Sequence, residues 1–387
     1  MRDNLYQKAA SIKQLKALAK SRLPRFAYDY LSRGCNEDLA ASNNRRALDE
    51  CYLQSTYLTP AEKATTSVEV LGQTYASPFG VAPLGLSGLV WPGASTFQAE
   101  AAKRANQPFI LSTVASISIE QAAASAKDCF WFQLYPPTDK AMLEDILKRL
   151  DAVGCKHLVV TIDVPSLGKR PRDIRAGLSL PPKMGLRSLS QIITRPAWAL
   201  STAIYGKPEF ETLKPYLKSQ SQNSQQNPSE LSDFIRKKLK DVVDIHLLES
   251  IRALWPHKLI VKGVLNEQDA ELAKQAGADA IIVSNHGGRQ LDAALPTITQ
   301  LPRIRERLGE DFAVMADSGV ESGVDLARFL AQGADMVFSG RAFMYGVGAL
   351  GEAGAGHVFD ILQTELLQVL EQLRCSHPTL LKNHRVE

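Results

Sequence analysis

A histidine and an arginine stand three residues apart, at positions 286 and 289, in the segment Ser-Asn-His-Gly-Gly-Arg-Gln-Leu-Asp. The segment follows the apolar run 280–283, so a buried strand would deliver it as a polar loop to one rim of a sheet. His286 can exchange a proton near neutral pH, and Arg289 carries a planar fork that suits a carboxylate. The pair could therefore bind a small acid and deprotonate it. Either residue alone is more often an ordinary loop residue, but the two glycines, which let backbone approach a ligand closely, favour a site.

The elements that must position this loop can be counted from the apolar runs. From Phe79 onward, short apolar runs alternate with longer segments of helical periodicity. Strands that alternate with helices predict a parallel sheet, and eight of them favour a closed (β/α)8 TIM barrel. An open doubly wound sheet is the alternative. The expected strands are 79–83, 109–112, 130–135, 158–163, 259–262, 280–284, 313–317 and 336–340, and the expected helices between them include 96–105, 119–126, 140–153, 267–276 and 324–332.

Polar residues and glycines stand at or just past the C-terminal ends of these strands. That rim is where the active sites of (β/α)8 barrels form. A random rim would not collect a lysine, a histidine, two aspartates, an arginine and several hydroxyls at these points, so we expect a site there. The residues are Gly85, Ser112, Gln133, Tyr135, Thr161, Asp163, Lys262, Ser284, His286, Asp317, Gly319, Gly340 and Arg341, together with Leu84 next to Gly85.

The last two strand ends and Lys262 indicate an anionic ligand. Phosphate groups in such barrels commonly bind where the loops after strands 7 and 8 present backbone N–H groups, and Gly319, Gly340 and Arg341 fit that place. A plain turn is the alternative for Gly319. An ammonium in a barrel mouth must be compensated by an anion, and an anionic reduced cofactor would compensate Lys262.

The composition is that of an ordinary globular protein. The 387 residues are 45% hydrophobic and 22% charged, which suits one domain over 1–387, and no apolar run approaches the length of a membrane span. The net charge of +4 is too small to indicate nucleic-acid binding. The five cysteines lack CxxC spacing, which favours reduced thiols over disulfides or a metal site. The first residues lack an export signal, so a cytoplasmic protein is expected.

Two segments lie outside the barrel pattern. Residues 1–60 show helical periodicity and are expected to form a helical cap. Residues 177–240 form an insertion after the fourth strand that is too long for an ordinary loop. Its first part combines apolar residues with lysines and arginines, whereas 219–229 is a Ser/Gln/Asn tract. We expect a membrane-contact segment, with a lid or a subunit contact as the alternatives.

The segment 284–292, together with Val261-Lys262-Gly263, resembles the FMN-dependent L-2-hydroxyacid dehydrogenase and oxidase family. This family includes glycolate oxidase, L-lactate dehydrogenase and (S)-mandelate dehydrogenase, and the resemblance covers nearly the whole chain. It implies FMN as the cofactor. It also implies that the insertion resembles the membrane-attaching segment of the mandelate dehydrogenase branch.

The resemblance implies a role for each residue of the rim. His286 would be the catalytic base, and Asp163 would steady its protonated form. The substrate would be bound by Arg170 and Arg289 at its carboxylate and by hydrogen bonds from Tyr30 and Tyr135. The cofactor would be held by Lys262 at the flavin N1 and O2 edge, by Leu84, Gly85, Ser112, Gln133, Thr161 and Ser284 near the ring, by Asp317 at the ribityl chain, and by Gly319, Gly340 and Arg341 at the phosphate.

The chain departs from the family in the loop after the seventh strand. The family usually has an arginine after the residues that match Asp317-Ser318-Gly319-Val320, and this chain has Glu321. A carboxylate cannot pair with phosphate. Either Arg341 and the backbone suffice, or FMN binds more weakly.

The expected reaction also follows from chemistry alone. Oxidising an alcohol beside a carboxylate removes two electrons and two protons, and no side chain accepts the electrons. A flavin does, and the protein supplies a carboxylate clamp, a base, and a cation where the reduced flavin gathers charge. We therefore expect oxidation of a lactate-like or mandelate-like L-2-hydroxy acid to the 2-oxo acid. An isomerase on the same kind of barrel and a non-catalytic phosphate-binding barrel are the alternatives.

The electron acceptor and the partners are inferred from the resemblance. The position of Gly85 is commonly alanine in the family's oxidases and glycine in its dehydrogenases, which points to a quinone-type acceptor. The alternative is an oxidase that reduces O2 to H2O2. Residues Leu89-Val90-Trp91-Pro92 resemble the mandelate branch and, with Val114, favour a large or aromatic acid. A peripheral position on the inner face of the membrane and a tetrameric homo-oligomer are expected.

Overall fold

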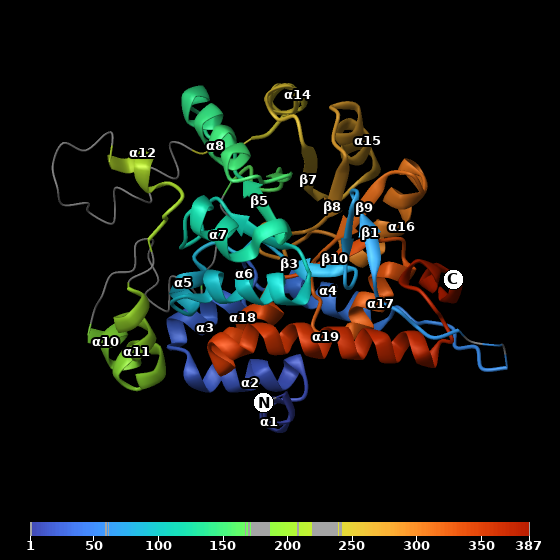
Figure 1. The fold of residues 1–387 in the computed structure, drawn as a ribbon, viewed down its shortest axis with the longest axis horizontal. Helices are drawn as coiled ribbons and strands as arrows, with labels where there is room; N and C mark the ends of the chain where they lie inside the picture. The colour runs from blue at the N-terminus through green and yellow to red at the C-terminus, as the bar shows by residue number, and fades with distance from the viewer. Residues whose placement is uncertain are drawn as a thin grey trace.

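The computed structural model describes residues 2–58, 60, 62–166, 168, 171, 186–206, 209–218, 239 and 242–386. Eight parallel strands close into a barrel in the order β10-β3-β4-β5-β6-β7-β8-β9, with helices around them (Figure 1). This confirms the (β/α)8 prediction and excludes the open doubly wound sheet. The strands are β3 (Phe79–Val81), β4 (Phe109–Ser112), β5 (Phe130–Leu134), β6 (His157–Thr161), β7 (Lys258–Val264), β8 (Ala280–Val283), β9 (Ala313–Ala316) and β10 (Met336–Ser339).

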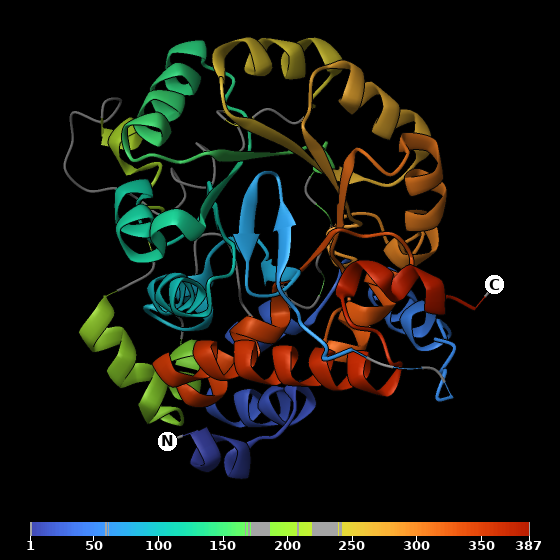
Figure 2. The same ribbon diagram turned by 45° about the vertical axis from the view of Figure 1, so that its right-hand side comes forward.

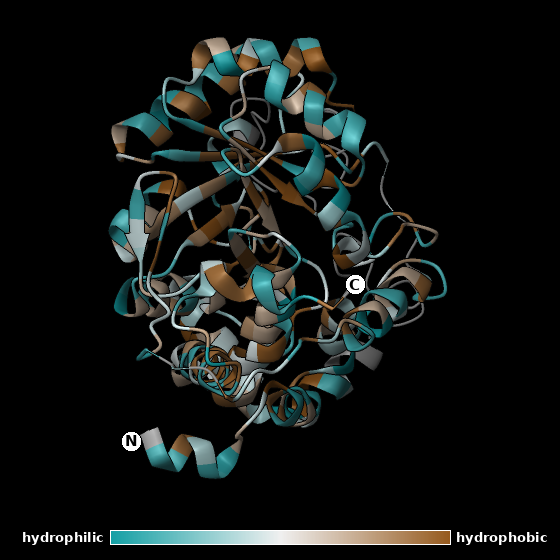
Figure 3. Cartoon of the chain, turned by 90° about the vertical axis from the view of Figure 1, so that its right-hand side faces the viewer, coloured by the Kyte–Doolittle hydropathy of each residue, from teal (hydrophilic) through white to brown (hydrophobic). Residues whose placement is uncertain are grey.

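The barrel strands are short apolar runs because both of their faces are covered. Ile110, Trp131 and Ile260 point into the barrel and belong to one buried cluster. Neighbours such as Leu111 and Phe132 point outward and pack in the larger cluster beneath the helices. The hydropathy colouring of Figure 3 shows apolar strands inside and polar outer faces on the helices.

A ring of helices surrounds the strands (Figure 2). Five of the α-helices in this ring begin after a residue whose side chain accepts a backbone N–H of the first turn, which fixes the point where the helix starts. These caps are Ser118, Asp139, Asp244, Asn266 and Ser322. The elements are α5 (Ser87–Val90), α6 (Ala94–Ala105), α7 (Ile119–Ala126), η1 (Lys127–Cys129), α8 (Lys140–Ala152), α14 (Ile245–Leu254), α15 (Glu267–Gln275), α16 (Thr297–Leu308), α17 (Gly323–Ala331), α18 (Arg341–Leu350), α19 (Glu352–Gln372) and η2 (Pro378–His384).

A hairpin that the expected strands did not include covers the N-terminal end of the barrel. Its strands, β1 (Val68–Val70) and β2 (Gln73–Tyr75), pair antiparallel and lie across the barrel in Figure 2. Tyr75 joins the buried interior cluster, where its hydroxyl accepts a 3.0 Å hydrogen bond from Nε1 of Trp131. The polar rim at the opposite end is thereby left as the place for a site.

The N-terminal cap is helical only as far as Asp49. It consists of α1 (Arg2–Lys8), α2 (Ile12–Arg22), α3 (Arg25–Ser32) and α4 (Leu39–Asp49). The helical part of the expected cap 1–60 ends earlier than expected, because the described residues between Asp49 and residue 60 form no helix and Leu53 instead bridges to Arg385. α2 packs along α18, where an added Cβ on Gly348 would lie 3.1 Å from Leu23.

The insertion contributes α10 (Leu186–Ile193), α11 (Pro196–Tyr205) and α12 (Lys214–Lys218). α11 docks on the body through Trp198, which is buried, stacks edge-on against Phe26, and donates a 3.0 Å hydrogen bond from Nε1 to the Val90 carbonyl. In α12, the Tyr216 hydroxyl accepts a 3.1 Å hydrogen bond from Arg149 and also contacts Asp145. Both ends of the described insertion are therefore fixed to the barrel.

Candidate active site

His286 and Asp163 meet at the C-terminal rim of the barrel. Asp163 lies just past β6 and His286 just past β8, and Nδ1 of His286 is 3.0 Å from Oδ1 of Asp163. Burial raises the pKa of the Asp163 carboxyl, but the nearby His286 and Lys262 outweigh burial and hold that pKa below its usual value. The carboxylate is ionised at neutral pH and favours the imidazole tautomer that carries its proton on Nδ1. Nε2 is then the atom that can accept a proton.

The backbone around His286 is held in an unusual conformation. His286 itself has φ +58°, in the left-handed region that residues with a side chain seldom adopt. Its N–H donates to Oγ of Ser284 at 3.0 Å, and the N–H of Gly287 donates to Oγ of Ser318 at 3.0 Å. Such strain persists only where the surroundings over-determine it, and it commonly occurs at functional sites.

Gly288 packs against the N-terminal cap. A Cβ on Gly288 would lie 2.4 Å from the backbone nitrogen of Ala41 in α4, and its carbonyl accepts the N–H of Cys35 at 2.9 Å. The glycine is therefore required because the loop packs directly against the N-terminal cap.

Lys262 is buried in the barrel mouth and is already paired. Its Nζ lies 3.0 Å from Oδ2 of Asp317 and donates to Oγ of Ser284 at 2.9 Å. Burial lowers the pKa of Lys262, but the carboxylates of Asp317 and Asp163 outweigh burial and hold that pKa above its usual value. The ammonium therefore stays charged. An anion was expected to compensate this charge, with a reduced cofactor as the candidate, and within the protein Asp317 already does so. Ser284 links Lys262 to the His286 backbone.

A bulge in β7 aims Lys262 at this position. The pairing of β7 with β8 shifts register between Lys262 and Val264, and Gly263 between them has φ +102°. A Cβ on Gly263 would lie 2.6 Å from Cγ of Asp163. Glycine at this position therefore lets the lysine strand and the aspartate loop come together.

The residues expected around a flavin ring present several buried polar atoms toward the same rim. Oγ of Ser112 donates to Oε1 of Gln133 at 2.8 Å, which fixes the amide. Within the described residues, Nε2 of Gln133, Oγ1 of Thr161 and Oδ2 of Asp163 are buried without a hydrogen-bond partner. Buried polar atoms are normally satisfied, so these donors and acceptors fit a bound ring with polar edges.

The structure has little room for a side chain at Gly85, in the loop after β3. A Cβ there would lie 2.8 Å from Cγ2 of Val114. The Gly85 carbonyl accepts the hydroxyl of Tyr30 at 3.2 Å, so the residue expected to bind the substrate also touches this loop. Leu84 approaches the start of α18, because a Cβ on Gly340 would lie 3.0 Å from its Cδ2.

Arg341 begins α18 directly after Gly340, at the end of β10. One of its terminal nitrogens donates to the Gly287 carbonyl at 2.6 Å, and its Nε is buried without a partner among the described residues. Gly319 follows β9 with φ +96°. A helix N-terminus with a guanidinium and backbone N–H groups fits a phosphate. The residues present therefore fit both ends of FMN.

The expected substrate-binding residues lie at the same rim, except where the chain is not described. The guanidinium of Arg289 donates to the carbonyls of Tyr30 at 2.9 Å and Arg33 at 2.7 Å, and its carbon lies 5.0 Å from the centre of the Tyr30 ring. The backbone N–H of Tyr135 donates to Oγ1 of Thr113 at 2.9 Å, which sets the direction of that residue. Arg170 lies outside the described residues.

Residues that were not predicted join the loop 284–292 to the cap. Asn285 and Asn44 exchange two amide hydrogen bonds of 2.8 and 2.7 Å, and Asp292 accepts the N–H groups of Glu37 and Ala40 at 2.9 and 3.1 Å. These contacts span more than 240 residues, so no local pattern could indicate them. Asn285 and Asp292 were visible in the segment, but their partners were not.

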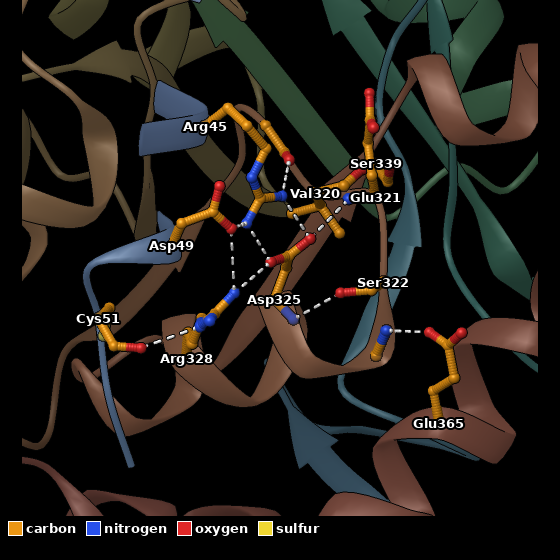
Figure 4. Close-up of polar contacts among 12 residues, drawn as sticks. Arg45, Asp49, Cys51, Val320, Glu321, Ser322, Asp325, Arg328, Ser339 and Glu365 are labelled. Atoms are coloured by element: carbon orange, nitrogen blue, oxygen red, sulfur yellow. Dashed lines mark hydrogen bonds and ion pairs between the residues drawn. The ribbon is translucent and has the colours of Figure 1, made fainter. Parts of the chain in front are cut away.

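A second unpredicted cluster holds the loop after β9. Asp325 is buried and receives two 2.7 Å hydrogen bonds from the guanidinium of Arg45 and one of 3.0 Å from Arg328 (Figure 4). The same carboxylate accepts the backbone N–H of Glu321 at 3.0 Å, and Arg45 also donates to the Gly319 carbonyl. The loop that carries Gly319 and Glu321 is therefore fastened to α4 and α17.

The stretch Leu89-Val90-Trp91-Pro92 lies beneath the insertion. Leu89, Val90 and Trp91 are buried, and the carbonyls of Val90 and Pro92 accept hydrogen bonds from Trp198 and Ser201 of α11. In the described structure this stretch anchors α11.

The comparisons with known proteins agree with this geometry. The sequence profile of the FMN-dependent dehydrogenases matches residues 19–387. The L-lactate dehydrogenase of Stenotrophomonas maltophilia (strain K279a) is 36% identical over 355 residues, 91% of each chain, and that of Pseudomonas syringae pv. syringae (strain B728a) is 36% identical over 361 residues, 92% of this chain and 93% of the relative. The crystal structure of monotopic membrane protein (S)-mandelate dehydrogenase superposes with a TM-score of 0.91 and 30% identity, covering 97% of this chain and 98% of the other.

A barrel of this form with these matches defines a class of flavoenzyme. The chain belongs to the FMN-dependent dehydrogenases and, within them, to the FMN-dependent 2-hydroxyacid dehydrogenases. Its cofactor is FMN. Among the helices of the described part of the chain, none is long and apolar enough to cross a membrane.

Proposed function

We propose that this protein oxidises an L-2-hydroxy acid to the 2-oxo acid with His286 as the base. The observation that carries the proposal is the 3.0 Å contact between His286 and Asp163 beside the buried Lys262. Bound FMN supplies the acceptor of the two electrons. The chain supplies the proton acceptor, the substrate clamp and a fixed positive charge.

The proposed steps of the chain follow from its geometry. Nε2 of His286 takes the hydroxyl proton of the substrate, because Nδ1 is engaged by Asp163. The imidazolium that forms is stabilised by the ionised Asp163. Lys262 presents its ammonium to the cofactor edge that gains charge, while Asp317 and Ser284 keep its position fixed. We further propose that Ser112, Gln133, Thr161 and the Leu84–Gly85 backbone hold the ring and that Gly319, Gly340 and Arg341 hold the phosphate.

The substrate carboxylate is proposed to bind Arg289, with Arg170 as its partner and with hydrogen bonds from Tyr30 and Tyr135. The stacking of the Arg289 guanidinium on Tyr30 supports this placement, because it orients one planar fork beside one of the proposed substrate ligands. A carboxylate clamp beside a base also argues against an isomerase and against a non-catalytic barrel.

Arg289→Lys is expected to raise KM about tenfold, because an ammonium cannot reproduce a bidentate fork and a charge-assisted hydrogen bond is worth about 1.5–3 kcal/mol. Steady-state kinetics with the preferred hydroxy acid measure this. Arg303→Lys, on the exposed side of α16, is the matched control and should leave KM unchanged. An unaltered KM and kcat in Arg289→Lys would remove this arginine from the site.

The electron acceptor is proposed to be a quinone or similar carrier. The support is Gly85, at the position where the resembling oxidases commonly have alanine. Space beside the flavin edge influences how readily reduced flavin meets oxygen, and Val114 already limits that space. The alternative is an oxidase that forms H2O2.

Gly85→Ala is expected to raise the rate of reoxidation by O2 about tenfold, a change of about 1.4 kcal/mol in the barrier. The added methyl must displace Val114, since the two carbons would otherwise be 2.8 Å apart. Stopped-flow reoxidation of substrate-reduced enzyme, in air and with a quinone analogue, measures it. Oxygen as good an acceptor as the quinone in the unaltered protein would make it an oxidase.

A peripheral contact with the membrane is proposed for α10 and α11. Ile193, Leu200 and Ile204 are each at least 63% exposed, whereas the other side of α11 buries Trp198. These three residues belong to α10 and α11, which lie at the edge of the molecule in Figure 1, and exposed apolar side chains at an edge suit contact with a membrane surface. We accordingly propose that the protein lies peripherally on the inner face of the cell membrane. The expected homo-tetramer stays a prediction.

Replacing Ile193, Leu200 and Ile204 together by serine is expected to weaken binding to anionic liposomes at least tenfold, since each apolar side chain contributes about 1.5–3 kcal/mol when buried. Point changes are preferable to a deletion, which would remove the buried Trp198 and Leu213. Leu380→Ser, an exposed leucine in η2, is the control. Intact protein that fails to sediment with liposomes would favour the lid or subunit contact.

A further inference from the structure

Glu321 puts a carboxylate into the loop after β9, which is proposed above to receive the flavin phosphate. Its Oε1 lies 2.9 Å from Nζ of Lys16, a residue of α2 that is 305 positions earlier in the chain. The same ammonium lies 5.3 Å from the centre of the Tyr345 ring, one turn after Arg341 in α18. Lys16 thus joins three elements at one point: α2, the loop after β9, and α18.

The other cationic side chains near this loop bind partners other than Glu321. Arg45 binds both oxygens of Asp325 and also Asp49, and Arg328 binds Asp325 (Figure 4). Arg341 donates to backbone carbonyls, and within the described residues it forms no ion pair with a carboxylate. Lys16 is therefore the cation that neutralises Glu321, and Arg341 keeps its charge for an anion.

Tyr345 shows that this end of the site is polar as well as buried. Its hydroxyl is fully buried and has no hydrogen-bond partner among the described residues, as is true of Nε of Arg341. Burial raises the pKa of the Tyr345 phenol, while Arg341 lowers it and Glu321 raises it, so the oxygen lies within the field of both charges. Without a cation beside it, the negative charge of Glu321 would therefore be felt at this end of the site, next to Arg341 and Tyr345.

We propose that Lys16 is a positioning residue for the cofactor: it holds the Glu321 carboxylate against α2 and neutralises its charge. The FMN phosphate can then bind Arg341 without electrostatic repulsion from Glu321. The inference rests on the proposed place of the phosphate between Gly319 and Arg341. Its consequence is specific to the phosphate. Affinity for FMN depends on Lys16, whereas affinity for riboflavin, which has the same ring without the phosphate, does not.

The test is a titration of the full-length apoprotein with FMN and with riboflavin, followed by the quenching of flavin fluorescence. Lys16→Met is expected to raise the Kd for FMN about fivefold, the upper range for a partly exposed ion pair, and to leave the Kd for riboflavin unchanged. Glu321→Gln should bind FMN at least as tightly as the unaltered protein. The double variant should match Glu321→Gln, because Lys16 has no function once the carboxylate is gone.

Lys20→Met, an exposed lysine one turn further along α2, controls for the loss of a charge from this helix and should change neither Kd. An equal change for both flavins in Lys16→Met, or no change for either, would overturn the proposal. A double variant as weak as Lys16→Met would also overturn it, because Lys16 would then bind the phosphate itself.

Arg341→Gln tests the proposed position of the phosphate separately from the role of Lys16. A loss of FMN affinity without a loss of riboflavin affinity in that variant supports the place of the phosphate, whatever Lys16 does. Equal losses for the two flavins would show that the phosphate lies elsewhere, and the role of Lys16 would fall with it.

Discussion

His286→Gln is expected to lower kcat at least ~100-fold while FMN stays bound, because general-base catalysis contributes about 10²–10⁴ in rate. Glutamine keeps a polar side chain of similar reach but cannot accept and hold the hydroxyl proton. The loop should keep its shape, because its fixed points are the His286 N–H on Ser284 and the Asn285–Asn44 pair, and the substitution leaves both in place. Steady-state kinetics and the visible spectrum of the purified variant give the two readouts.

His246→Gln is the matched control, since His246 lies on α14 with its side chain 86% exposed. It should leave kcat and the flavin spectrum unchanged. Turnover near the normal rate in His286→Gln would contradict the assignment of the base. Loss of the flavin together with turnover would instead make His286 a cofactor ligand.

Asp163→Asn is expected to lower kcat by about 10²–10⁴ without a matching change in KM. Asparagine preserves the shape that fits against Gly263, but it removes the charge that stabilises the imidazolium and can turn an N–H₂ toward Nδ1. Because the pKa of Asp163 is lowered in the folded protein, its carboxylate is ionised at neutral pH and above, so the loss should be seen throughout that pH range.

The chain offers a close control for Asp163. Asp151 and His257 form a similar pair on the surface, 2.8 Å apart against 3.0 Å for Asp163 and His286, and the Asp151 side chain is 61% exposed. Asp151→Asn should leave kcat unchanged. A kcat that stays within twofold of normal in Asp163→Asn would mean that His286 needs no ionised partner.

The barrel was predictable because its strands are short apolar runs, with a polar residue or a glycine at or just past most of their ends. His286, Asp163 and Lys262 could be placed on one rim by that rule alone, and the structure brings all three together. The β1–β2 hairpin could not, because three-residue strands such as Val68–Val70 are too short to show a period.

Contacts between residues that are distant in the sequence could not be predicted either. The Lys262 ammonium was expected to need an anion, but its pairing with Asp317 was not predicted, because it arises where β9 follows β8 around the barrel. The bulge at Gly263 depends on the pairing of two strands, and the Lys16–Glu321 pair depends on how α2 packs. Each is a product of tertiary packing that no single segment carries.

The central claim is that this protein removes two electrons from an L-2-hydroxy acid, and the most direct measurement is the visible spectrum of the FMN-loaded enzyme under anaerobic conditions. Adding the L-enantiomers of lactate and mandelate is expected to bleach the oxidised flavin and to yield one 2-oxo acid per flavin, whereas the D-enantiomers leave the spectrum unchanged. The acid that bleaches faster identifies the preferred substrate. A flavin that stays oxidised with every L-2-hydroxy acid, or an acid that is converted without bleaching, would contradict the account.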